Sequence, residues 1–186
     1  MPDPNALPRR SLLKLGLIGS ALLAGGGYLA TRLTDGTPIG RLPQARHLDA
    51  AAQTLLAKVF EAVLDAMLPA DARQREALVT AAVGGLDQGL GRMPLHIQRE
   101  LKDLLGLLAL APARALLTGR WRGWAAATVP ETQALLTGLR TSSVELRRLV
   151  YVTVHDLATA SYYALPQTWA AIGYRGPIAP GPGVDV

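Results

Sequence analysis

The chain has 186 residues, enough for one domain with a hydrophobic core, and it contains no cysteine. The lack of cysteine excludes disulfides, thiolate zinc sites, cysteine-ligated iron–sulfur clusters and covalently attached haem c from this chain. The formal net charge is +5. Residues 1–30 carry +2 of it (three basic, one acidic), and the rest of the chain carries +3 (16 basic, 13 acidic). Because this charge is spread along the chain, the sequence predicts no nucleic-acid partner.

The N-terminal segment combines adjacent basic residues with an apolar run. Arg9, Arg10 and Lys14 precede an apolar stretch over residues 15–30. As a helix this stretch would span about 24 Å, less than the ~30 Å hydrocarbon core of a bilayer. A basic start followed by a short apolar run is typical of a targeting signal, with an N-terminal anchor or a core helix as the alternatives.

Four residues of this segment, Arg9, Arg10, Leu13 and Lys14, are similar to the twin-arginine export pattern (Ser/Thr)-Arg-Arg-x-Phe-Leu-Lys. A proline replaces the hydroxyl residue and a leucine replaces the phenylalanine. The resemblance implies a partner, the twin-arginine translocase, and export in the folded state to the periplasm. No single cleavage site stands out in the sequence. Both fates of the leader therefore remain as alternatives: removal after export, or retention as a membrane anchor.

Hydrophobic periodicity predicts an all-α fold, a single-domain helical bundle, for the body of the chain. Alanine and leucine, both strong helix formers, dominate, and no strand-like alternation exceeds four residues. The predicted helices cover residues 50–68 with Asp49 as N-cap, 74–90 closed by Gly89 and Gly91, 95–111, 113–117 closed by Gly119, 130–140, and 144–165 capped by Ser142 or Ser143.

Turn residues set the predicted boundaries of this domain. Asp35-Gly36 and Thr37-Pro38 indicate a linker, and the proline- and glycine-rich sequence from Pro166 predicts a mostly extended tail. The predicted organisation is a leader over residues 1–30, a linker over 31–46, a helical domain over 47–177 and a flexible tail over 178–186.

The polar residues form no familiar catalytic pattern. His47, His96 and His155 lack partners at metal-binding helical spacing, and adjacent His155 and Asp156 are expected to point about 100° apart and form no dyad. We expect the scattered carboxylates on solvated helix faces: Glu61, Asp65, Glu76, Asp87, Glu100, Asp103, Glu131, Glu145 and Asp156. The sequence therefore predicts no catalytic, cofactor-binding or metal-binding residue in this chain.

Aromatic residues gather near the C-terminus. Tyr162, Tyr163, Trp169 and Tyr174, four of the nine aromatics (three Trp, five Tyr, one Phe), lie within thirteen residues. Tyrosine and tryptophan commonly anchor interfaces. The alternative is that these side chains pack on their own bundle, and both arrangements can hold together.

This segment resembles the YY-x-x-P-x-x-W-x-x-I-G-Y-x-G-P ending of the gluconate 2-dehydrogenase subunit 3 family. The matching residues, which the resemblance implies bind the partner, are Tyr162, Tyr163, Pro166, Trp169, Ile172, Gly173, Tyr174, Gly176 and Pro177. Leu68-Pro69 after the first predicted helix and the twin-arginine leader are also similar to that family.

The resemblance implies a non-catalytic small subunit of a dehydrogenase associated with the cytoplasmic membrane. Its partner would be a flavoprotein of the glucose–methanol–choline type that carries FAD and oxidises an alcohol, sugar or sugar acid. A multihaem cytochrome c would be a third subunit. The small subunit would bind the flavoprotein, stabilise it and supply the export signal. The alternatives are a stand-alone exported helical enzyme that uses His155 or His96 with a metal or ligand, and a membrane-tethered structural protein.

Overall fold

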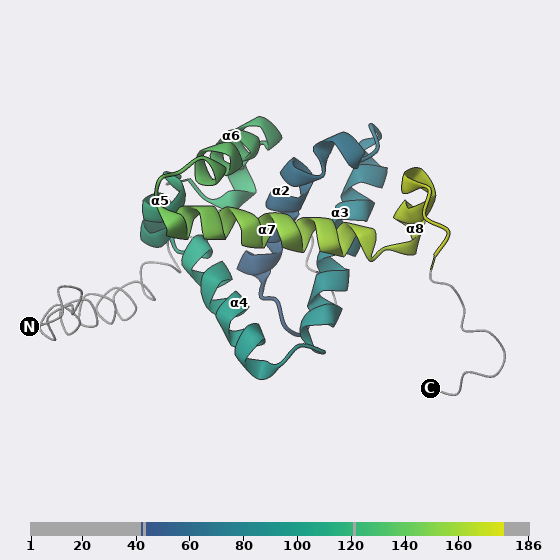
Figure 1. Ribbon diagram of the computed structural model, residues 1–186, viewed down its shortest axis with the longest axis horizontal. Helices are drawn as coiled ribbons and strands as arrows, with labels where there is room; N and C mark the ends of the chain where they lie inside the picture. The colour runs from purple at the N-terminus through teal and green to yellow at the C-terminus, as the bar shows by residue number, and fades with distance from the viewer. Residues whose placement is uncertain (1–41, 43, 121, 177–186) are drawn as a thin grey trace, which may run out of the picture.

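One central helix, α2 (Ala50–Val63), organises the bundle. The structure is a computed structural model and describes residues 42, 44–120 and 122–176. Eight of the fourteen α2 residues are buried, and Leu55, Leu56 and Phe60 are fully enclosed. It is contacted by α7 (Glu145–Tyr163), α3 (Ala72–Leu90), α6 (Val129–Arg140) and α4 (Leu95–Ala109) (Figure 1). A helix that is apolar on several sides belongs at the centre of a fold, which is where α2 lies.

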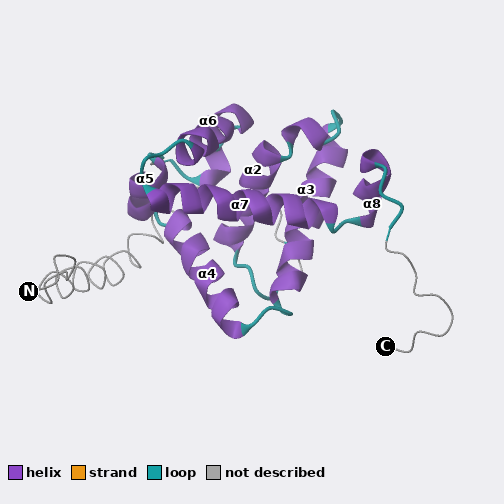
Figure 2. Cartoon of the chain, in the orientation of Figure 1, coloured by secondary structure: helices purple, strands orange, loops and turns teal. Residues whose placement is uncertain are grey.

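The all-α prediction is confirmed, because the described residues form helices and loops without a strand (Figure 2). Helix α7 crosses the face of the bundle in Figure 1 and packs on α2, α3 and α6. The remaining elements are α5 (Ala111–Thr118), α8 (Pro166–Trp169) and 3-10 turns at Asp65–Met67, Trp124–Ala126 and Ala170–Ile172.

Most helix ends follow local signals. Asp49 caps α2 by accepting the Ala52 N–H at 2.8 Å, and Gly119 closes α5 with a left-handed φ of 76°, both as predicted. Two ends differ. Helix α2 stops at Val63 and is followed by a 3-10 turn, and α7 begins after Val144 with no side-chain cap, so the predicted serine cap is wrong.

The segment that leads into α2 is fastened to α3 by a buried carboxylate. Asp87 is only 3% exposed and accepts the backbone N–H groups of Arg46, His47 and Leu48 at 2.9, 2.9 and 2.8 Å. We call residues 44–48 the strap. Asp87 was expected on a solvated helix face, and that expectation is wrong because the strap covers it. The end of the predicted linker is thus bonded to the bundle.

A second residue reinforces the strap from α2. The buried Gln53 side chain accepts the Leu42 N–H at 3.1 Å and donates to the Leu48 carbonyl at 2.8 Å. At Gly91 an added Cβ would lie 2.7 Å from Nε2 of His47, so a glycine lets the strap lie this close to the end of α3. The strap is therefore part of the folded body.

Burial acts to raise the pKa of Asp87, but the three backbone N–H groups and nearby His47 outweigh it and hold the pKa below the usual aspartate value. A carboxyl whose pKa is lowered by folding stabilises the fold above the pKa it has in the unfolded chain. That contribution disappears as the pH falls through the lower folded-state pKa.

Asp87→Ala should lower the free energy of unfolding by about 3 kcal/mol at pH 7, because three buried N–H groups lose their acceptor. The difference from the parent protein should shrink as the pH falls below about 4, where the parent loses the same contribution. Urea unfolding at a series of pH values measures both effects. Asp103→Ala on an exposed position of α4 is the control and should change little. A pH-independent difference would contradict the assignment.

Candidate partner-binding site

The C-terminal segment after α7 forms two short turns that pack on the end of α7. Pro166 is the first residue of α8, and a 3-10 turn follows at Ala170–Ile172. The predicted extended conformation is therefore wrong for residues 166–172. Pro166 follows the end of α7, and its fixed φ suits the first position of a new helix.

Tyr162 anchors this segment from the inside. Its ring is 3% exposed and its hydroxyl donates to the Met67 carbonyl at 3.1 Å. The buried Thr168 hydroxyl donates to the Tyr162 carbonyl at 3.0 Å. Two buried polar side chains thus satisfy their hydrogen bonds on the segment itself and on the turn after α2.

Trp169 holds the following turn. Its indole N–H donates to the Tyr163 carbonyl at 2.8 Å, and its ring meets the Tyr174 ring edge-on with centroids 5.2 Å apart. Gly173 and Gly176 have φ values of 71° and 93°, which favour glycine. A Cβ at Gly176 would also lie 3.1 Å from the Trp169 ring. The glycines of the motif therefore let the chain wrap around the tryptophan.

Several large side chains of this region face outward. Tyr163 is 44% exposed, Ile172 46% and Tyr174 48%, and neighbouring Met67 is 38% exposed. The Tyr163 hydroxyl lies 3.7 Å from the Met67 sulfur. We call these four residues the aromatic surface. The motif residues thus divide between holding the segment in place and covering its exterior. Tyr162 packs on its own bundle, and the interface role of the exposed side chains stays a prediction.

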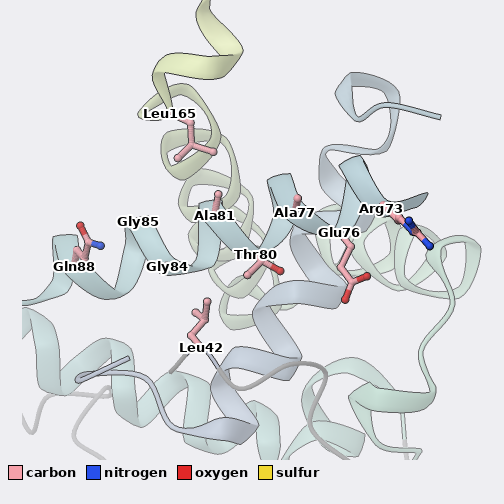
Figure 3. Close-up of a pocket in the computed structure, with 10 residues that line it drawn as sticks. All are labelled: Leu42, Arg73, Glu76, Ala77, Thr80, Ala81, Gly84, Gly85, Gln88 and Leu165. Carbon is pink, nitrogen blue, oxygen red and sulfur yellow. The ribbon is translucent and has the colours of Figure 1, made fainter. Parts of the chain in front are cut away.

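An open groove adjoins the segment on α3 and has a volume of about 750 Å³. Small residues, Ala77, Ala81, Gly84 and Gly85, form its floor, and Leu165 lies on one side (Figure 3). The opposite side is Leu42, and the polar ends carry Arg73, Glu76 and Gln88. The groove is therefore lined by residues from three parts of the chain: Leu42 at the start of the described residues, α3, and Leu165 just after α7.

The histidines are dispersed over the described residues. His155 Nδ1 lies 3.2 Å from Asp156 Oδ1, so the expectation that these neighbours cannot meet is wrong. Both side chains are exposed on the surface of α7, where they are free to adopt rotamers that bring the two groups together. His96 is exposed on α4, and His47 belongs to the strap. Residues 42, 44–120 and 122–176 contain no group of three or more metal-ligating side chains.

No family model, curated protein or solved structure matches this chain. The likeness to gluconate 2-dehydrogenase subunit 3 therefore rests on the motif residues. Within the described part of the chain, no helix has the length and apolar character needed to cross a bilayer. Arg9, Arg10, Leu13, Lys14 and Pro177 lie outside the described residues.

Trp169→Ala should loosen residues 164–176 while leaving the bundle intact, because α8 packs mainly on α7. Loss of the indole hydrogen bond and the Tyr174 contact should raise amide exchange in this segment about tenfold. Hydrogen–deuterium exchange with mass spectrometry resolves the segment from α2. Gln167→Ala, at an exposed neighbouring position, is the control. A comparable rise in α2 would show instead that Trp169 supports the whole core.

Proposed function

We propose that this chain is the non-catalytic small subunit of a periplasmic dehydrogenase of the glucose–methanol–choline flavoprotein type. It binds the FAD-carrying large subunit, stabilises it and escorts it through the twin-arginine translocase. A multihaem cytochrome c is the third subunit in this proposal. The observation that carries the proposal is the aromatic surface, held by the residues that resemble the subunit 3 motif.

The geometry of this surface favours a binding role. Exposed tyrosine and isoleucine side chains offer large contact areas of the kind that anchor protein interfaces. The Trp169 hydrogen bond and the close approach of Gly176 hold the backbone beneath them. A surface that is already ordered loses less conformational entropy on association than a loose tail would.

The export part of the proposal connects the two ends of the chain. Arg9 and Arg10 resemble a signal read by a pathway for folded proteins, and the described body has a surface suited to a partner. A flavoprotein must fold around FAD before it can use that pathway. Binding before export lets one leader serve both chains.

Replacing both Ile172 and Tyr174 with serine should weaken binding to the purified flavoprotein by about 30-fold or more, as expected for central interface anchors. The midpoint of urea unfolding should change little because both side chains are about half exposed. Hydrogen–deuterium exchange of residues 164–176 measures any local loosening from the lost Trp169–Tyr174 contact, which a variant with Ile172→Ser alone avoids. Isothermal titration calorimetry measures the affinity. Leu95→Ser, at a position 67% exposed on α4, is the matched control. Equal affinity for the parent and the double variant would reject the aromatic surface as the binding site.

Replacing both Arg9 and Arg10 with lysine should leave this chain and the flavoprotein in the cytoplasm, because the paired arginines are the core of the resembled signal. Cell fractionation followed by immunoblotting and a flavin absorbance spectrum locates both proteins. Arg32→Lys, outside the resembled pattern, makes the same kind of exchange and is the control. Undiminished export of an active flavoprotein, in this variant or after deletion of this chain, would contradict the escort role.

A further inference from the structure

Charge is unevenly distributed over the described body. From Leu110 to Leu149 the chain has six arginines and two glutamates, a net charge of +4. The other described residues have eight basic and nine acidic side chains, a net charge of −1. The positive charge of the body therefore comes from one continuous stretch of the chain.

Within this stretch, several arginines remain at the surface. Arg114 is buried, and Arg120 pairs with Glu131 at 3.2 Å. The other arginines of the stretch are Arg122, Arg140, Arg147 and Arg148, and its other acidic residue is Glu145. Arg122, Arg140 and Arg148 are exposed and Arg147 is half-buried.

Hydrogen bonds place some of these arginines at one end of the molecule. Arg147 donates to the Leu116 carbonyl at 2.8 Å, which joins the start of α7 to α5, and Arg148 donates to the Ser142 carbonyl at 2.7 Å. Figure 1 shows α5 beside the start of α7. We define the arginine end by the residues Leu116, Arg140, Val144, Leu146, Arg147, Arg148 and Leu149.

The same end carries most of the strongly exposed aliphatic side chains. Among the described residues, five large apolar side chains are more than half exposed, and Leu116 (75%), Leu149 (59%), Leu146 (53%) and Val144 (51%) are four of them. Leu146 and Leu149 are three apart on α7 and so neighbour each other on its surface. Leu95 on α4, 67% exposed, is the fifth.

We propose that the arginine end docks on the surface of an anionic lipid bilayer. Leucine side chains enter the headgroup region there while neighbouring arginines meet lipid phosphates, the composition typical of interfacial binding surfaces. The arginines are spread over separate elements, which suits a plane of negative charge. A single-stranded nucleic acid would instead require stacking aromatics beside the cations. The proposal does not rest on the dehydrogenase role, and its failure would leave that role untouched.

The test uses the absence of native cysteine, which makes an introduced one a unique labelling position in the full chain. Leu116→Cys, Leu149→Cys and the control Leu95→Cys each carry an environment-sensitive fluorophore. The probes are vesicles of phosphatidylcholine alone or mixed with phosphatidylglycerol, with brominated lipid as quencher. With anionic vesicles, the fluorophores at 116 and 149 should shift to the blue and be quenched, and the one at 95 should stay in water.

Charge variants complete the test. Replacing both Arg140 and Arg148 with glutamine should raise the anionic lipid concentration needed for the half-maximal shift at position 116 by about fivefold per arginine. Exposed Arg92, in the turn after α3, and exposed Arg99 on α4, replaced in the same way, should have less effect. Equal quenching at all three positions, or none at 116 and 149, would overturn the proposal. An equal shift with soluble polyglutamate would also overturn it and would point to an acidic protein.

Discussion

The bundle depends on one buried carboxylate. The three backbone N–H groups of the strap come before or at the start of α2, where no earlier helical turn can accept them. The Asp87 carboxylate accepts all three hydrogen bonds and so holds the strap against α3. This contact holds buried Leu48, which directly precedes the Asp49 cap at which α2 begins. Because α2 contacts α3, α4, α6 and α7, its position determines how the other helices meet.

The end of α7 shows how one motif can serve structure and recognition together. Tyr162 and Thr168 fill the inside of the segment, and Trp169 holds the turn that contains Gly173. The side chains that alternate with them are exposed. A stretch that had only to bind could be loose, and one that had only to pack would not expose half of an isoleucine and two tyrosines. The arrangement therefore supports the proposed docking role without requiring any further ordering of the backbone.

The sequence predicted what local chemistry determines. The helices followed from periodicity, and Asp49 and Gly119 were found because a cap lies within a few residues of the groups it satisfies. Asp87 was missed because its partners lie 39 to 41 residues away. The motif residues were found as a cluster, but their division into inward and outward groups was not. It depends on contacts such as that between Tyr162 and Met67, 95 residues apart.

The strap also determines how the protein responds to mechanical load. A force applied to the N-terminal part of the chain reaches the described body at Leu42, passes through the bond to Gln53, and then meets the hydrogen bonds to Asp87 before it reaches α2. These bonds come from consecutive residues and end on one side chain, so a pull from that end meets Arg46 first and then His47 and Leu48. The entrance of the chain is thus reinforced at the point where a pull from that end first acts on the fold.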